Sequence, residues 1–130
     1  VIIVSGHNLG TAPIEDAINE HPAVAESAIV GFPHDIKGSA LYGYITLKDK
    51  GESRNHDNLR IEINQLITDR IGPIAKLDKM QFTNGLPKTR SGKIMRRILR
   101  KIACNETDRI GDTSTLLNQE VVQDIIDNVV

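Results

Sequence analysis

The segment from Pro87 to Ile94, Pro-Lys-Thr-Arg-Ser-Gly-Lys-Ile, combines residue types that favour binding of an anion. Gly92 lets a ligand approach the backbone closely, and Lys93 adds a point charge. We expect Ser91 to cap a helix, so that Lys93 lies at the helix N-terminus, where N–H groups attract phosphate or carboxylate. The segment is not a P-loop, because Pro87 and Ile94 stand where that motif requires Gly and Ser or Thr. A solvated basic helix start explains the same residues equally well.

A second segment, from Val4 to Thr11, reads Val-Ser-Gly-His-Asn-Leu-Gly-Thr. Ser5 and Gly6 would form the turn of a strand–Gly–strand hairpin, which exposes backbone donors and acceptors beside a narrow gap. The Gly-x-Gly-x-x-Gly fingerprint of dinucleotide-binding folds is absent. Taken alone, this segment indicates no more than a turn.

Composition limits the possible partners. The 130 residues suit one domain, and 39 % of them are hydrophobic, with aromatics so few that Ile, Leu and Val must supply the core. The net charge is −1, which favours neither nucleic acid nor a membrane surface. The charge is uneven, because the stretch from Lys88 to Lys101 contains seven Lys or Arg residues and no Asp or Glu.

The single cysteine, Cys104, excludes an intrachain disulfide and favours a reducing compartment. No apolar run approaches the ~20 residues that span a bilayer, and no signal peptide is evident. We therefore expect a cytoplasmic protein, or one of the mitochondrial matrix, with no membrane partner. The four His residues show no metal-ligand spacing, so we expect no metal site. The chain starts within a strand-like run, and its first Met is Met80, as expected for a piece of a longer chain.

Hydrophobic periodicity and turn residues predict a small α+β domain. Its sheet would have roughly three main strands flanked by helices, with a short β-hairpin at the N-terminus. The expected strands are Val1–Val4, Ala25–Phe32, Leu41–Leu47 and Lys79–Thr83. The first expected helix is capped by Thr11 and ends at His21-Pro22, and the second carries a stripe from Leu59 to Arg70 and ends at Gly72-Pro73. The basic helix follows from Ser91, and a last helix covers Val121–Val130.

Together the two opening segments carry a family resemblance. Ser-Gly-His-x-Leu-Gly-Thr near the start and Leu-Pro-Lys-Thr-Arg-Ser-Gly-Lys-Ile-Met-Arg-Arg near the end resemble the acyl-CoA synthetase branch of the adenylate-forming enzymes. The intervening and following stretches fit as well, at His34–Gly38, Ile71–Ala75, Arg97–Ile102 and Gly111–Leu116. The whole run most resembles AMP-forming acetyl-CoA synthetase (acetate–CoA ligase). Residues 1–130 would then be its C-terminal domain, with the N-terminal adenylate-binding domain absent.

The resemblance implies a reaction in two steps. Acetate and ATP would give acetyl-adenylate and pyrophosphate, and coenzyme A would then displace AMP. The N-terminal domain would hold most of the ATP and acyl pocket, including Mg²⁺. The C-terminal domain would rotate against it between the steps. Alone, the C-terminal domain would be inactive.

Site residues follow from the resemblance position by position. Lys93 matches the lysine that approaches the acyl carboxylate and the α-phosphate during adenylation. Ser5 and Gly6 match the hairpin that lines the pantetheine tunnel, which a Cβ at Gly6 would narrow. Asn8 departs from the family, because many relatives have a phosphate-binding Arg there and Asn offers only a neutral amide. A further Arg that contacts the coenzyme A nucleotide in relatives aligns with Thr68, and Arg70 would replace it.

Lys93 also matches a site of reversible lysine acetylation, which would remove its charge. A protein acetyltransferase and a deacetylase would then be partners, and Thr89–Gly92 would form part of the recognised surface. Two other classes stay open from the sequence. One is a nucleic-acid-binding module that uses the basic stretch, which contains no aromatic residue. The other is an interaction domain recognised by the acetyltransferase.

Overall fold

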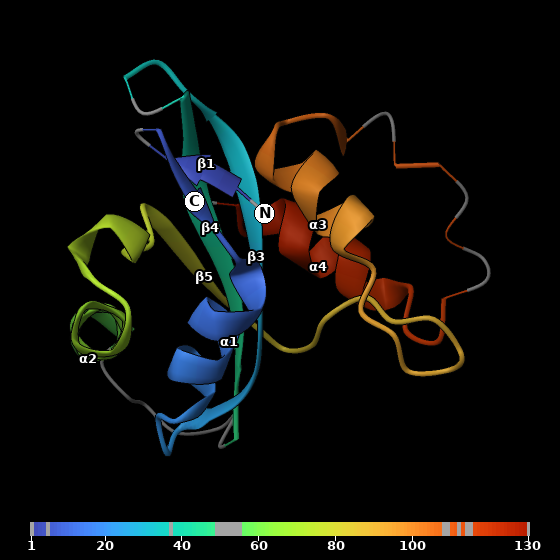
Figure 1. Ribbon diagram of the computed structural model, residues 1–130. Coiled ribbons are helices and arrows are strands. Elements are labelled where there is room, and N and C mark those ends of the chain that lie inside the picture. The colour runs from blue at the N-terminus through green and yellow to red at the C-terminus, as the bar shows by residue number, and fades with distance from the viewer. Residues whose placement is uncertain are drawn as a thin grey trace.

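The structure of the chain is a computed structural model that describes residues 2–4, 6–36, 38–48, 56–107, 110–111, 113 and 116–129. Its elements follow the order that the sequence predicts (Figure 1). They are β1 (Ile2–Val4), β2 (His7–Leu9), α1 (Thr11–Asn19), β3 (Val24–His34), β4 (Gly38–Leu47), α2 (His56–Arg70), the 3₁₀ helix η1 (Pro73–Ala75), β5 (Lys79–Thr83), α3 (Arg96–Ala103) and α4 (Glu120–Asp127). Val1 and Val130 of the predicted elements lie outside the described residues.

Strand β4 is the centre of the sheet. It pairs antiparallel with β3 along nearly its whole length and parallel with β5 from Tyr42 to Thr46. The β1–β2 hairpin joins the same sheet at one point, where Val4 pairs with Gly38. This confirms the predicted α+β domain, with three main strands and an N-terminal hairpin.

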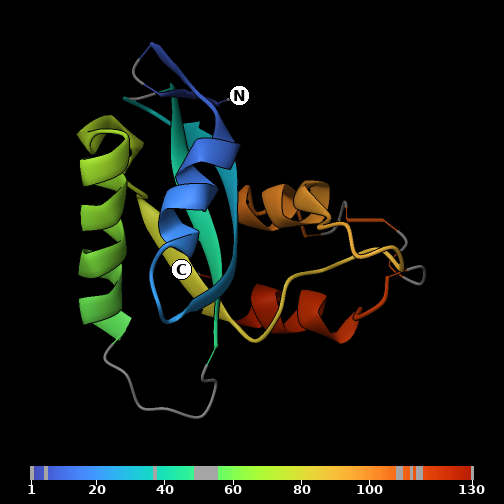
Figure 2. The same ribbon diagram turned by 60° about the horizontal axis from the view of Figure 1, so that its bottom comes forward.

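Helices cover both faces of the sheet (Figures 1 and 2). Leu41 and Ile45 face the core under α1 and α2, whereas Tyr42 and Tyr44 face the core under α3 and α4. The alternation that predicted the strand therefore sorts its residues between two separate cores, because successive strand side chains point to opposite faces.

The two tyrosines of β4 form the centre of the second core. Their rings stack with centroids 4.5 Å apart, and both residues are fully buried. The Tyr44 hydroxyl donates a hydrogen bond to the Leu99 carbonyl of α3 (2.9 Å), and the Tyr42 hydroxyl donates to Gln81 Oε1 (2.9 Å). Gln81 in turn donates to the Ile125 carbonyl of α4 (3.1 Å). The scarce aromatic residues thus connect the sheet to both helices of this face.

Glu15 of α1 connects this helix and α3 to the outer edge of β3. Its Oε2 accepts the backbone N–H of Ile29 (2.8 Å), and its carboxylate forms an ion pair with Arg96 of α3. The Glu15 side chain is 10 % exposed and that of Arg96 is 44 % exposed. No local pattern in the sequence indicates this role of Glu15, because both partners are distant along the chain.

Two predicted helix starts are wrong. Helix α1 begins at Thr11, with Gly10 as its N-cap and no side-chain capping bond. Helix α3 begins at Arg96, with Met95 as its N-cap, so Ser91 caps nothing and Lys93 lies outside the helix. The cause at α3 is an antiparallel bridge between Lys88 and Ile94, which holds the intervening residues in a turn.

Replacing Glu15 by Ala should lower the free energy of unfolding by about 2 kcal/mol, because the Ile29 N–H then loses its partner. Urea denaturation of the 130-residue chain measures the change. Asp16→Ala, an exposed position on the same helix, should change it by less than about 0.5 kcal/mol. Equal effects of the two substitutions would show that Glu15 contributes no more than a surface carboxylate.

Burial, and to a smaller extent the neighbouring Tyr42, raises the pKa of the Tyr44 hydroxyl well above its ordinary value. The unfolded chain therefore releases this proton first, at a pH near about 10, and the folded chain still retains it. We expect the unfolding free energy to fall as the pH rises above about 10. Tyr44→Phe should weaken this fall in urea titrations between neutral and alkaline pH. An unchanged pH dependence would contradict the assignment to Tyr44.

Candidate functional site

Residues 88–94 form a tight turn closed by hydrogen bonds around Thr89. The Thr89 N–H donates to the Lys93 carbonyl (2.9 Å), and the Gly92 N–H donates to the Thr89 carbonyl (2.9 Å). The Lys93 N–H donates to Thr89 Oγ1 (3.1 Å). Gly92 has φ +89°, a conformation that other residues rarely adopt. The backbone of Lys93 is therefore fixed by its own turn.

A second set of contacts holds this turn on the body of the domain. Asn118 receives the Lys88 N–H on its Oδ1 (3.0 Å) and donates from its Nδ2 to the Leu86 carbonyl (2.8 Å). The Leu117 N–H donates to the Lys88 carbonyl (2.9 Å), and the Lys88 ammonium pairs with Glu26 of β3. The turn is thus supported by β3 and by the segment that leads into α4.

Lys93 itself is exposed, and among the described residues its side chain has no hydrogen-bond or ion-pair partner. Arg90, on the same turn, is exposed as well. The location at a helix N-terminus that the sequence predicted for Lys93 is wrong, so the helix dipole does not create an anion site here. The turn instead offers an anion an exposed ammonium group on a backbone whose position is fixed.

The β1–β2 hairpin carries the second candidate site. Ile3 pairs with Asn8 and Val4 pairs with His7 across the turn. Gly6 has φ +81°, and a Cβ on it would meet no heavy atom of the described chain within 4 Å. Within this chain, glycine is therefore favoured by its backbone conformation, and a narrowed passage would need a second domain opposite. Asn8 is exposed, and Ser5 lies outside the described residues.

Arg70, the candidate for a coenzyme A contact, ends α2 and is 58 % exposed. Its Nη2 lies 2.8 Å from Glu20 Oε1, so a phosphate would have to compete with this carboxylate. The Thr68 hydroxyl donates to the Asn64 carbonyl of its own helix (2.9 Å). Thr68 is neutral, and the positive charge of Arg70 is compensated by Glu20. Neither residue therefore offers a free positive charge to a phosphate.

The structure does not bring the two main candidate sites together. The hairpin lies at one end of the molecule, and the turn formed by 88–94 lies at the opposite end, in both views (Figures 1 and 2). Within one orientation of this chain, the hairpin and the 88–94 turn therefore form two separate sites.

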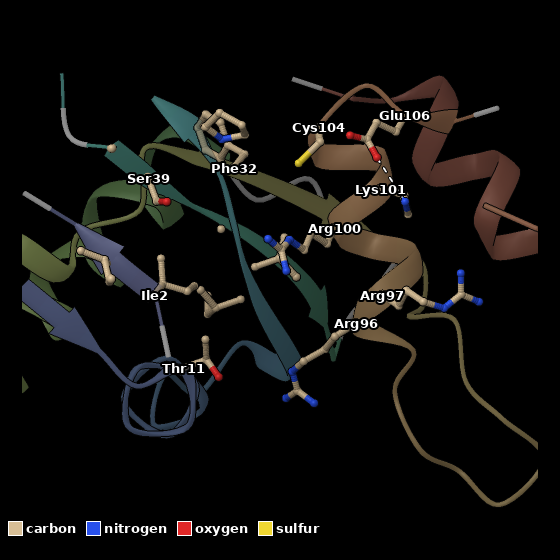
Figure 3. Close-up of a pocket in the computed structure, with 16 residues that line it drawn as sticks. Ile2, Thr11, Phe32, Ser39, Arg96, Arg97, Arg100, Lys101, Cys104 and Glu106 are labelled. Carbon is tan, nitrogen blue, oxygen red and sulfur yellow. Dashed lines mark hydrogen bonds and ion pairs between the residues drawn. The ribbon is translucent and has the colours of Figure 1, made fainter. Parts of the chain in front are cut away.

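A cleft that the sequence analysis missed lies between α3 and the outer edge of β3 (Figure 3). Its volume is about 860 Å³. One wall is cationic, with Arg96, Arg100 and Lys101, and the floor includes Val30 and Phe32. The only sequence feature that indicated this cationic wall is the four-residue spacing of Arg96 and Arg100, which puts both on one face of a helix.

Most of the basic residues of α3 have partners within the chain. Arg96 pairs with Glu15, Lys101 Nζ lies 3.2 Å from Glu106 Oε2, and Arg97 Nη1 donates to the Ile110 carbonyl (3.1 Å). Arg96 and Arg97 are nevertheless exposed, and among the described basic residues of α3 only Arg100 lacks an ion-pair or hydrogen-bond partner. This pairing weakens the nucleic-acid alternative, which needs free cations along a groove.

In the described part of the chain, no group of three His, Cys, Asp or Glu residues is placed to hold a metal ion. None of the helices among the described residues has the length and hydropathy needed to cross a membrane.

Comparison with known proteins agrees with the motifs. The model of the AMP-binding enzyme C-terminal domain family matches residues 13–93, more than half of the chain. The chain belongs to this family. It is similar to acetyl-coenzyme A synthetase of Syntrophobacter fumaroxidans (61 % identity over 98 % of the chain and 19 % of the relative). It is also similar to that of Desulfatibacillum aliphaticivorans (59 % identity over 98 % of the chain and 20 % of the relative).

Among solved structures, the fold is similar to the crystal structure of an acyl-CoA synthetase from Brucella canis. The TM-score is 0.73, with 32 % identity over 84 % of this chain and 19 % of that one. The chain thus spans about a fifth of the length of the curated relatives it matches. The fold class and family expected from the sequence are confirmed, whereas the roles of Lys93, Ser5, Gly6, Asn8 and Arg70 stay predictions.

Replacing Thr89 by Val removes the side-chain acceptor of the Lys93 N–H. We expect hydrogen exchange at the Lys93 amide to accelerate about fivefold, the value of one hydrogen bond of about 1 kcal/mol. Nuclear magnetic resonance of the 130-residue chain measures this rate. Ser91→Ala is the matched control, because it removes the neighbouring hydroxyl and leaves Thr89 Oγ1 in place. The same acceleration in both variants would show that Thr89 does not fix the turn.

Proposed function

We propose that this chain works as the C-terminal domain of an AMP-forming acetate–CoA ligase. The complete enzyme converts acetate, ATP and coenzyme A to acetyl-CoA, AMP and pyrophosphate through acetyl-adenylate. Relatives named acetyl-coenzyme A synthetase, similar over 98 % of the chain, support this reaction. Because the chain matches only about a fifth of their length, the acetate pocket and the Mg²⁺ that accompanies ATP belong to the other domain.

Lys93 is the residue proposed to act in the first half-reaction. Attack of the acetate carboxylate on the α-phosphate brings two anions together and adds negative charge at the phosphorus. An ammonium group there offsets the repulsion and stabilises the charge that develops. Two observations support Lys93 in this role: its side chain has no competing carboxylate among the described residues, and its backbone is fixed by the Thr89 turn.

The β1–β2 hairpin is proposed to act in the second half-reaction. Ser5 and Gly6 would line the passage through which the pantetheine thiol of coenzyme A reaches the adenylate. The positive φ of Gly6 supports a tight turn in which position 6 carries no side chain. Asn8 would contribute at most a neutral contact to the phosphates of the nucleotide or of coenzyme A. Arg70 would contribute at most a contact whose charge is partly compensated by Glu20.

The separation of these two sites is the observation that carries the proposal. A single active site can use both ends of this domain only if the domain turns between the half-reactions. Each orientation then presents one constellation to the same adenylate. The hydrogen bonds that fix the turn at residues 88–94 favour a rotation of the whole domain over a local rearrangement of that turn.

An exposed lysine on a projecting turn is also accessible to a second protein. This supports the proposal that an acetyltransferase modifies Lys93 and a deacetylase restores it, with Thr89–Gly92 as part of the contact surface. Acetylation converts the ammonium to a neutral amide and removes the charge that adenylation needs.

Lys93→Ala in the complete enzyme should lower adenylation from acetate and ATP at least about 100-fold, as loss of one transition-state charge contact does. Thioester formation from supplied acetyl-adenylate should stay within about twofold, because that step uses the other end of the domain. Pyrophosphate release and acetyl-CoA formation measure the two steps separately.

Lys76→Ala is the matched control, because Lys76 is exposed and lies outside both candidate sites. It should leave both half-reactions intact. Equal loss of the two steps in Lys93→Ala would contradict the role of Lys93, and activity of the 130-residue chain alone would contradict the need for a second domain.

A further inference from the structure

Strand β3 is an edge strand, and part of its backbone faces away from β4. Residues of an antiparallel pair alternate in the direction of their backbone groups. The Ile29 N–H bonds the Glu15 side chain, so it points to the free edge. By the same alternation the N–H of Gly31, two residues on, also points to that edge.

The contacts of Glu15 show that the free edge of β3 binds a carboxylate. Its carboxylate accepts the Ile29 N–H and is paired with the guanidinium of Arg96, which reaches the edge from α3. The edge N–H and the arginine act together on one carboxylate, which is a charge-assisted contact on both sides. The Ile29 N–H and the Arg96 guanidinium therefore already have their partner within the chain.

The same pair of groups recurs one step further along the cleft. Gly31 follows Ile29 by two residues, about 6.8 Å along a strand, and Arg100 follows Arg96 by four, about 6 Å along a helix. Figure 3 shows Arg100 extending from α3 toward β3, with Cys104 just after the end of that helix. The strand edge and the helix therefore offer a second N–H and a second guanidinium at matching spacing.

No described carboxylate occupies this second position. Arg100 is exposed and has no ion pair or side-chain hydrogen bond with any described residue. Glu106, which also lines the cleft, pairs with Lys101. Around the position lie apolar surfaces of Ile2 and Phe32, and Ile2 also covers Gly31, at 3.1 Å from where a Cβ would be.

We propose that this cleft docks an extended segment of a partner protein that carries an acidic residue between apolar ones. The acidic side chain takes the position on Gly31 and Arg100 that Glu15 takes on Ile29 and Arg96. Its two apolar neighbours point to the opposite face of the segment and cover Ile2. Charge complementarity selects this partner, because Arg100 is the cation of the cleft that has no partner among the described residues. Strand-edge recognition with side-chain pockets is an established mode of peptide binding.

The test is a titration of the ¹⁵N-labelled 130-residue chain with the blocked peptide acetyl-Thr-Val-Glu-Val-Thr-amide, followed by amide chemical shifts. The Gly31 amide should shift most, together with its neighbours on β3. Arg100→Ala, and separately replacement of the peptide's Glu by Gln, should each weaken binding about tenfold or more, as loss of a charged hydrogen bond does.

Arg90→Ala is the matched control, because Arg90 is an exposed arginine of the same basic stretch outside the cleft. It should leave the affinity within about twofold. Circular dichroism of each variant checks that α3 is intact, which we expect because position 100 is exposed.

Three results would overturn the proposal. Equal weakening by Arg90→Ala and Arg100→Ala would reveal unspecific attraction to the basic end. Shifts centred on 88–94 instead of Gly31 would place the contact elsewhere. Propionate binding as tightly as the peptide would show a site for small carboxylates, with no contribution from a segment.

Discussion

The contact of Glu15 with Ile29 and Arg96 determines how the rest of this domain is arranged. Glu15 comes from α1 on one face of the sheet, Arg96 comes from α3 on the other face, and they meet at the edge of β3. A buried carboxylate is costly unless its partners are complete. Here an N–H and a guanidinium complete them, so the contact positions α3 along β3. The cleft beside Arg100 and the orientation of the segment before α3 both depend on that position.

The strands and most helices could be predicted from the sequence because their signals are local. Tyr42 and Tyr44 alternate with Leu41 and Ile45, and a period of two is decisive for a strand. Leu59, Ile63 and Ile67 recur at helical spacing and are all buried. These patterns specify which side faces a core without any knowledge of the partner.

The site was predicted less completely because its geometry depends on contacts that are distant along the chain. Ser91-Gly92-Lys93 has the local features of a helix start, but contacts with Asn118 and Leu117 hold the segment as a turn. Glu15 is 14 residues from Ile29 and 81 from Arg96. No periodicity reports such pairs. The residue type of Lys93 was informative about chemistry, whereas its surroundings had to come from the fold.

The stacked tyrosines have a consequence for spectroscopy. The chain contains no Trp, and its two tyrosines lie between the sheet and the pair α3 and α4. The Tyr44 hydroxyl bonds α3 directly, and the Tyr42 hydroxyl is linked to α4 through Gln81 of β5. Near-ultraviolet circular dichroism depends on fixed packing around aromatic rings. The domain's own near-ultraviolet signal therefore reports the docking of α3 and α4 on the sheet, and no extrinsic label is needed to follow it.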